Sequence, residues 1–290
     1  MRAVLEQKRW TVLRVLQWTT DFFQRKGVKN PRLDAEVLLA HLLGLDRVGL
    51  YTNYDKPLRE EELKAFREMV QRRISREPIA YITGQKEFWS LSFKVSPACL
   101  IPRPETEVLV EEALKAAQEV PPPLQILEIG TGCGAVAVAL AKELPEAEIW
   151  ATEKSPYALE VARQNVALHG VSGRVVLLEA DLFPERGTFS LIVSNPPYVP
   201  TEEVLRLDPE VRDFEPLEAL DGGPDGLLYF RRIASRVRQY LRKGGWLVLE
   251  VGKGQDQEVQ SILKEAGLSR IELRRDYSGV KRIVKGKLEG

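Results

Sequence analysis

The chain has 290 residues, of which 44% are hydrophobic, so it can bury the core of one large domain or two smaller ones. Its 42 Lys and Arg residues balance its 42 Asp and Glu residues, which argues against a protein that coats nucleic acid through bulk charge. No apolar run approaches the ~18 residues of a membrane span, and the few cysteines and histidines are scattered, so we expect a cytoplasmic protein without membrane anchor, disulfide framework or metal site.

The first part of the chain predicts a small all-helical domain and a β-hairpin that links it to the rest. Apolar residues recur at helical spacing over residues 4–26, 33–43 and 60–76. Short apolar stretches with polar interruptions over residues 85–97 indicate the hairpin. No catalytic motif occurs among the helices, and residues 1–10 lack the apolar core of a signal peptide. The helices could bind a partner or position a substrate, or they could be a purely structural cap.

Residues 100–107 (LIPRPETE) form a constrained segment before the next predicted helix. Two prolines stiffen it, and Thr106 or Glu105 could open the helix that follows. Arg103 and Glu105 could therefore lie at the edge of a site. The same residues could equally serve helix entry and a surface ion pair.

After three consecutive prolines, strands and helices alternate along the remaining chain. Strands are predicted at 124–129, 148–152, 174–178, 191–194, 246–251, 271–275 and 280–284. Helices are predicted at 135–144, 156–169, 226–241 and 255–266. This alternation predicts an α/β fold with a doubly wound, mostly parallel sheet. The final pair of strands predicts a hairpin and at least one antiparallel strand at the sheet edge.

The stretch Ser194-Asn195-Pro196-Pro197-Tyr198 follows a buried strand and predicts a binding site for a planar NH2 group. The prolines hold the backbone rigid. The Asn195 side-chain oxygen could accept one N–H and the Pro196 carbonyl the other, while Tyr198 could stack on the plane of the group. Asn-Pro is also a common turn initiator, so a plain turn is the alternative.

The loop Gly130-Thr131-Gly132-Cys133-Gly134 ends one predicted strand and opens a helix, as in a nucleotide-binding site. Its Gly-x-Gly-x-Gly spacing is tighter than that of a dinucleotide fold and suits the methionine and ribose parts of a nucleoside. Glu153 ends the next strand, where it could accept the ribose hydroxyls. Asp181 could accept from an adenine amine, with Leu182 or Phe183 beside the ring. All follow successive strands, at the carboxyl edge where open α/β sheets bind ligands.

Together these motifs resemble the class I S-adenosylmethionine-dependent methyltransferases that act on exocyclic or amide nitrogens. Further segments narrow the resemblance to the HemK/PrmC family, the peptide chain release factor N5-glutamine methyltransferases: 78–88 (PIAYITGQKEF), 100–107 (LIPRPETE), 215–226 (EPLEALDGGPDG) and 276–279 (DYSG). The resemblance covers nearly the whole chain. It implies a seven-stranded methyltransferase sheet with a small N-terminal all-helical domain and a linking β-hairpin. The implied domains are a partner-binding domain (1–84), the hairpin linker (85–99) and a methyltransferase domain (100–290).

The resemblance also implies the reaction, a methyl transfer from S-adenosylmethionine to the glutamine of the Gly-Gly-Gln motif in class 1 peptide chain release factors. The implied cofactor-binding residues are Gly130, Thr131, Gly132, Cys133, Gly134, Glu153, Asp181, Leu182 and Asn195. The implied catalytic residues are Asn195, Pro196 and Tyr198, and the substrate-binding residues are Asn195, Pro196, Pro197, Tyr198, Arg103 and Glu105. The sequence departs from the family at Glu153, where Asp is usual, and at Leu182, which is aromatic in some members.

The expected mechanism is in-line displacement at the methyl group, helped by orientation and by two acceptors on the substrate NH2. An adenine-N6 DNA methyltransferase with the same Asn-Pro-Pro-Tyr grip is the main alternative. The six basic residues between Arg231 and Lys243, with no acid among them, favour that alternative, but we interpret them as a solvated helix face. We therefore expect no stable nucleic-acid binding. A non-enzymatic binding module is a second alternative.

Overall fold

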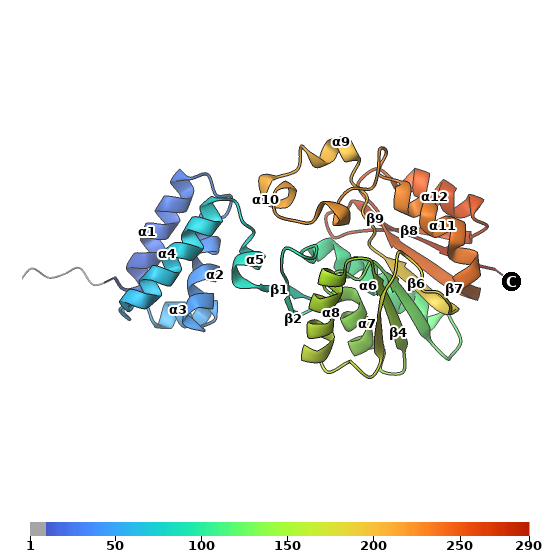
Figure 1. Cartoon of the computed structure of the whole chain (residues 1–290), viewed down its shortest axis with the longest axis horizontal. Coiled ribbons are helices and arrows are strands. Elements are labelled where there is room, and N and C mark those ends of the chain that lie inside the picture. The colour runs from blue at the N-terminus through green and yellow to red at the C-terminus, as the bar shows by residue number, and fades with distance from the viewer. Residues whose placement is uncertain (1–9, 290) are drawn as a thin grey trace, which may run out of the picture. The chain divides into compact units, whose positions relative to one another are not determined.

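The computed structural model describes residues 10–289, which form two compact units, one ending at Gly84 and the other beginning at Gln85 (Figure 1). Within its described residues, the first unit contains α1 (Val12–Arg25), α2 (Pro31–Leu43), α3 (Arg47–Thr52), α4 (Glu60–Ile74) and α5 (Ile79–Thr83). The predicted helices correspond to α1, α2 and α4, whereas the short α3 and α5 were not predicted. Residues 4–9 of the first predicted helix lie outside the described part of the chain.

The apolar faces of the longer helices form the core of the first unit. Leu16 and Phe23 of α1 are fully buried, as are Leu38 and Leu39 of α2, and Phe66 of α4 packs into the same cluster. Their spacing within each helix places them on one face, so burying that face fixes the helices against one another.

The second unit begins with a hairpin and continues as a seven-stranded sheet with flanking helices, as predicted. The hairpin consists of β1 (Gln85–Phe88) and β2 (Leu91–Lys94). The sheet strands are β3 (Gln125–Ile129), β4 (Glu148–Glu153), β5 (Val175–Glu179), β6 (Phe189–Ser194), β7 (Leu241–Glu250), β8 (Ser269–Arg275) and β9 (Lys281–Lys287). Their spatial order is β5-β4-β3-β6-β7-β9-β8, and β5, β4, β3, β6 and β7 run parallel. The sheet is therefore mostly parallel and doubly wound.

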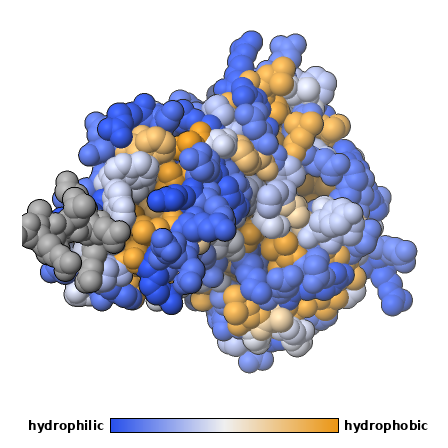
Figure 2. Space-filling model, turned by 60° about the vertical axis from the view of Figure 1, so that its left-hand side comes forward, coloured by the Kyte–Doolittle hydropathy of each residue, from blue (hydrophilic) through white to orange (hydrophobic). Residues whose placement is uncertain are grey.

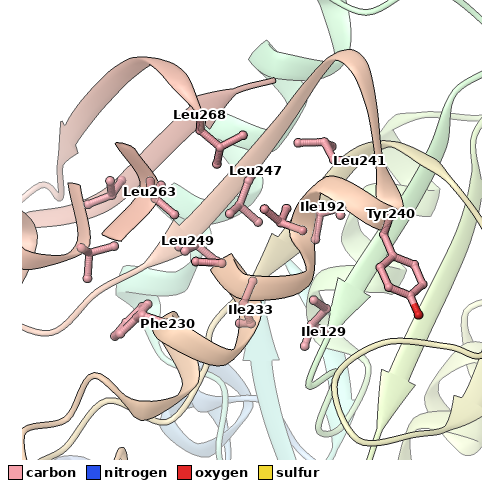
Figure 3. Close-up of a cluster of buried hydrophobic side chains, with 14 of the residues drawn as sticks. Ile129, Ile192, Phe230, Ile233, Tyr240, Leu241, Leu247, Leu249, Leu263 and Leu268 are labelled. Carbon is pink, nitrogen blue, oxygen red and sulfur yellow. The ribbon is translucent and has the colours of Figure 1, made fainter. Parts of the chain in front are cut away.

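The helices of the second unit cover both faces of this sheet (Figure 1). The longer ones are α6 (Glu107–Gln118), α7 (Ala135–Glu143), α8 (Pro156–Leu168), α11 (Leu228–Tyr240) and α12 (Asp256–Glu265). The short ones are η1 (Pro104–Thr106), α9 (Thr201–Val204), α10 (Pro209–Arg212) and η2 (Leu217–Ala219). Figure 3 shows Ile129, Ile192 and Leu249 of the sheet facing Phe230 and Ile233 of α11 in one buried cluster. Since side chains alternate along a strand, the intervening residues face the opposite layer of helices.

The antiparallel strand is not at the edge of the sheet, so that part of the prediction was wrong. β9 pairs antiparallel with both β7 and β8, which leaves β8 as the outermost strand. The reason is burial: Ile283 and Val284 of β9 are fully buried and require neighbours on both sides, whereas Arg274 and Arg275 of β8 are exposed.

The surface of the protein is mostly hydrophilic. On the face drawn in Figure 2, hydrophilic residues cover most of the surface and hydrophobic residues form groups between them. Among residues 10–289, no helix combines the length and the apolar character needed to cross a membrane.

Candidate active site

A cleft lies in the second unit at the carboxyl edge of the sheet, where the parallel strands β3, β4, β5 and β6 end. Among the predicted site residues, those that line it are Gly130, Gly132, Glu153, Asp181, Leu182, Asn195, Pro196 and Pro197. Lining residues that were not among the predicted site residues include Cys99, Leu100, Ser155, Pro216, Glu218 and Tyr229. The fold thus brings together residues from four strand ends, as the sheet topology requires.

The backbone of the glycine loop forms an open cradle on one side of the cleft. Gly130 and Gly132 have φ angles of 73° and 56°, in the left-handed region that glycine adopts without strain. A Cβ atom built on either residue would meet nothing within 4 Å. The loop therefore presents bare backbone to the cleft, which a nucleoside ligand can approach closely.

The other predicted loop residues stabilise the loop instead of lining the cleft. A Cβ on Gly134 would lie 3.3 Å from the Cβ of Ala162, so this glycine lets α7 pack closely on α8. Thr131 is buried and donates a 2.6 Å hydrogen bond to Glu128, whose pKa burial raises to about 7. Cys133 is buried as well. A direct cofactor contact through the side chains of Thr131 and Cys133 is therefore not supported.

Glu153 is held at the cleft with both carboxylate oxygens in defined positions. Oε2 accepts a 2.9 Å hydrogen bond from the backbone N–H of Gly132, and Oε1 accepts one of 2.9 Å from that of Ser155. Each carboxylate oxygen can accept more than one hydrogen bond, so both keep capacity for a ligand hydroxyl. The longer side chain of Glu, compared with Asp, reaches across the turn to the glycine loop.

The segment after β5 contributes Asp181 and Leu182 to the cleft. Asp181 forms an ion pair of 2.7 Å with Arg232 of α11, which the sequence analysis did not predict. Leu182 has a φ angle of +71°, an unfavourable conformation for a residue with a side chain, and its carbonyl accepts a 2.6 Å hydrogen bond from Thr152. Phe183 is buried and stacks on Tyr240 at 4.5 Å between ring centroids, so it cannot flank a ligand in the cleft.

Two hydrogen-bond acceptors follow the end of β6: the side-chain oxygen of Asn195 and the backbone carbonyl of Pro196. The Asn195 side chain donates from Nδ2 to the Thr106 hydroxyl at 3.2 Å, which leaves its Oδ1 as an acceptor. Among the described residues, no donor is bonded to Asn195 Oδ1 or to the Pro196 carbonyl. Both residues line the cleft. Both groups are therefore available as acceptors at the end of β6.

Tyr198 does not belong to the cleft lining, although it follows two residues that do. Its ring packs on the buried cluster beside Gly252, and its backbone carbonyl accepts a 2.9 Å hydrogen bond from Gln255. Burial raises the pKa of its phenol to about 12, so the hydroxyl is neutral. The ring is only partly buried against that cluster, so its stacking on a bound substrate stays a prediction.

Arg103 is also outside the cleft lining, because it pairs with a distant carboxylate. Its Nη2 donates a 2.5 Å hydrogen bond to Oε1 of Glu215, and Oε2 of Glu215 accepts from the Ile101 backbone N–H at 3.2 Å. Glu215 thereby joins residues 100–107 to residues 215–226, two segments that the sequence analysis noted separately. The Arg103 side chain is 30% exposed in this ion pair, and its substrate contact stays a prediction. Glu105 is not in the cleft lining, so its role stays a prediction.

Sequence reasoning missed several residues that shape this region. Thr106 was considered only for helix entry, Gln255 lies in no predicted motif, and Tyr229 was not noted. The guanidinium of Arg232 lies 5.6 Å from the Tyr229 ring centroid and pairs with Asp181, so it connects two residues of the cleft lining. No local signal identifies Thr106 or Gln255, because Thr106 meets Asn195 across 89 positions and Gln255 meets Tyr198 across 57.

This strand order, with a glycine cradle and an acidic residue at the end of the next strand, defines a class I methyltransferase that uses S-adenosylmethionine. The hMettl16 catalytic domain superimposes on it with a TM-score of 0.58 at 15% identity, over 80% of this chain and 83% of that chain. A methyltransferase from Pyrococcus furiosus does so with a TM-score of 0.53 at 19% identity, over 71% of this chain and 92% of that chain. At these low sequence identities, the two structural similarities show a shared fold and nothing more.

Sequence comparison assigns the family. Residues 14–84 match the PrmC N-terminal domain and residues 105–207 match the Methyltransferase small domain. The release factor glutamine methyltransferase of Geobacter sulfurreducens is 49% identical over 281 residues, which cover 96% of this chain and 97% of that protein. That of Rhodopirellula baltica is 44% identical over 283 residues, or 95% of each chain. The chain belongs to the release factor glutamine methyltransferase family.

Proposed function

We propose that this protein transfers a methyl group from S-adenosylmethionine to the side-chain amide nitrogen of the glutamine in the Gly-Gly-Gln motif of class 1 release factors. Family membership supports the reaction. The observation that carries the proposal is the pair of acceptors, Asn195 Oδ1 and the Pro196 carbonyl, in the same cleft as the glycine cradle.

The cradle and the residues around it would hold the cofactor. Gly130 and Gly132 offer backbone to the methionine and ribose parts, Glu153 offers carboxylate oxygens to the ribose hydroxyls, and Leu182 offers an apolar surface to the adenine. When bound, S-adenosylmethionine supplies a methyl group activated by its sulfonium. Because position 182 is Leu here and aromatic in some family members, no ring at this position can stack on the adenine. The ring of Tyr229 lies elsewhere in the cleft lining.

The acceptors at the end of β6 would orient the substrate amide. An amide nitrogen is a poor nucleophile because its lone pair is delocalised into the carbonyl. Two acceptors on its hydrogens direct that lone pair away from Asn195 and Pro196 and stabilise the positive charge that develops on nitrogen. Rigid prolines on both sides of the carbonyl keep this geometry without an entropic cost at the moment of reaction.

A DNA substrate is less well supported, because three of the six basic residues of α11 and its end are engaged within the protein. Arg231 pairs with Asp225 at 2.6 Å, and Arg232 pairs with Asp181. Arg242 donates to the carbonyl of Pro123 at 3.2 Å. Charges bound internally contribute less to the phosphate contacts that dominate DNA affinity.

The helical unit, residues 1–84, would bind the release factor away from the glutamine. It presents the ring of Trp18, which is 46% exposed and stacks on Phe22 at 5.0 Å. Trp18→Ala should then raise KM for the release factor and leave the affinity for cofactor unchanged. Because release factors act on ribosomes, this function also implies a cytoplasmic protein.

The direct test is a methyl-transfer assay with labelled S-adenosylmethionine, in which a class 1 release factor, duplex DNA and RNA are compared. We expect label on the release factor alone, and only at the Gly-Gly-Gln glutamine by peptide mass analysis. Asn195→Ala should lower turnover by more than ~100-fold, the scale of one lost oriented contact in a transition state. Calorimetry with S-adenosylhomocysteine should show retained binding. Label on DNA instead would reject the proposal.

A further inference from the structure

A closed loop connects the Asn-Pro-Pro-Tyr segment to α11. Residues 199–221 leave the sheet and return to the same point, where Val199 and Asp221 form an isolated parallel bridge. The backbone N–H of Gly222 donates to the carbonyl of Val199 at 2.8 Å, and the hydroxyl of Thr201 donates to Asp221 Oδ1 at 2.7 Å. The loop carries the short helices α9 and α10 (Figure 1) and the turn η2. Surface loops whose ends meet in this way are frequently functional.

The buried carboxylate of Glu215 fastens this loop to residues 100–107. Its side chain is 1% exposed. Oε1 accepts the 2.5 Å hydrogen bond from Arg103 Nη2, and Oε2 accepts the 3.2 Å hydrogen bond from the backbone N–H of Ile101, 114 positions away in the chain. A buried charge is costly to leave unpaired, so the carboxylate stays buried only while these partners stay in place.

The two segments that Glu215 joins both belong to the cleft wall. On one side, the lining includes Leu100, which immediately precedes Ile101. On the loop side, the lining residues are Pro216, Glu218 and Ala219. We call residues 216–219 the loop wall. Because the loop wall directly follows Glu215, this carboxylate holds it at the cleft.

The same segment, residues 100–107, also reaches the acceptor Asn195. The carbonyl of Arg103 accepts a 3.1 Å hydrogen bond from the backbone N–H of Thr106, and the Thr106 hydroxyl accepts the 3.2 Å hydrogen bond from Asn195 Nδ2. Glu215 and Asn195 are therefore attached to one short piece of chain. The position of the loop wall is thus fixed relative to the acceptors at the end of β6.

Leu217 of the loop wall lies between two lining residues, yet it is 59% exposed. A single exposed leucine is ordinary on a protein surface, but this one stands at the rim of the cleft. A substrate glutamine belongs to a protein chain, so its backbone must stay outside when its side chain enters the cleft. An apolar side chain at the rim is stabilised by contact with that backbone, because contact removes apolar surface from water.

We propose that the loop wall contacts the polypeptide on either side of the substrate glutamine, with Leu217 as a specificity-determining residue and Glu215 as the positioning residue that holds it. The inference rests on the proposed function, because it requires a protein substrate. It adds a release factor contact within the second unit, separate from the contact proposed for the helical unit. A nucleic-acid base carries no polypeptide, so this contact favours a protein substrate over DNA.

The first test compares Leu217→Ser with Leu205→Ser, which changes another leucine of the same loop, 73% exposed and outside the cleft lining. Leu217→Ser should raise KM for the release factor roughly tenfold, the scale of losing the burial of part of a leucine side chain. Its kcat and its affinity for S-adenosylhomocysteine should not change. Leu205→Ser should match wild type, and both variants should melt at the wild-type temperature because both side chains are exposed. Equal KM values for the two variants would overturn the proposal.

The second test addresses the positioning role. Glu215→Gln keeps the size of the side chain and removes the charge that Arg103 requires, so KM for the release factor should rise at least as much as in Leu217→Ser. Asp213→Asn, which breaks an exposed ion pair with Arg212 on the same loop, should match wild type. In the double variant Glu215→Gln/Leu217→Ser, KM should equal that of Glu215→Gln alone, because Glu215 acts through Leu217. Effects that multiply would refute the positioning role.

A binding measurement separates this proposal from the proposed function. Calorimetry with the S-adenosylhomocysteine-loaded enzyme should show tighter binding of release factor by wild type than by Leu217→Ser. If wild type shows this preference but methylates no release factor, the proposed reaction is refuted and the loop wall stands. If wild type methylates release factor with the same KM as Leu217→Ser, the loop wall is refuted and the reaction stands.

Discussion

The Gln255 side chain donates a 2.9 Å hydrogen bond from Nε2 to the backbone carbonyl of Tyr198. The same nitrogen lies 3.3 Å from the carbonyl of Gly226, and Oε1 accepts from the Gly252 backbone N–H at 2.9 Å. One side chain thus fastens the end of the Asn-Pro-Pro-Tyr segment to two other loops.

Gln255→Ala should loosen this end of the site. It leaves buried backbone groups unpaired, which costs roughly 1–3 kcal/mol of the free energy of unfolding. Turnover should fall more than cofactor affinity does, because Tyr198 adjoins the acceptors and lies outside the cradle. Urea denaturation and calorimetry measure the two effects. Gln257→Ala, at an exposed position of the same helix, should match wild type in both.

Gly226→Ala should be far more damaging than Gly254→Ala. Both glycines have positive φ angles, 72° and 89°, so both substitutions carry a backbone cost of about 1–2 kcal/mol. Only at Gly226 would the new Cβ collide, at 2.4 Å from the Tyr198 carbonyl oxygen, whereas at Gly254 it meets nothing within 4 Å. The difference between the melting temperatures of the two variants measures the destabilisation that the collision causes, because the backbone cost is common to both. Similar melting temperatures would contradict the packing described for this turn.

Gly132→Ala should weaken cofactor binding more than it weakens the fold. Its Cβ would point into the open cradle, where it meets no protein atom within 4 Å. Gly170→Ala has the same empty surroundings and a φ angle of 67°, but lies outside the cleft lining, so it controls for the backbone cost. We expect the two variants to unfold alike, with at least tenfold weaker S-adenosylhomocysteine binding for Gly132→Ala alone.

The stability of the fold should decline as the pH rises towards neutrality. Burial raises the pKa values of Glu128 and Glu250 from 4.5 to about 7. The folded state therefore holds these protons more tightly than the unfolded state, so their contribution is complete below pH 4.5 and is lost as the pH passes 7. Each group accounts for up to about 3 kcal/mol across that window, at 1.36 kcal/mol per pKa unit.

Urea denaturation at pH 5.5 and pH 8.5 measures this dependence. Glu250→Gln should reduce the difference between the two pH values, because its amide carries no titrating proton. Glu185→Gln, at an exposed position, should leave the difference as in wild type. If Glu250→Gln retained the full difference, the raised pKa of that carboxyl would not be its source.

Much of the fold and part of the site follow from local sequence patterns. The helical and strand periodicities predicted the elements within a few residues at most ends, because each pattern reflects which face of one segment is buried. The glycine loop, Glu153 and Asn195 could be placed at one sheet edge, because parallel strands end at the same edge. Side-chain directions were harder to predict, as the ring of Phe183 shows, which is buried against Tyr240.

By itself, the sequence determined the alternation of elements, the rigid proline segment and the glycine turn, since these depend on residues near one another in the chain. Only the tertiary structure decided the partners of those residues. Thr106 meets Asn195 across 89 positions and Arg103 meets Glu215 across 112, and β9 lies inside the sheet instead of at its edge. The physical reason is that such contacts arise when strand ends and loops converge in space, and no local pattern of residues encodes that convergence.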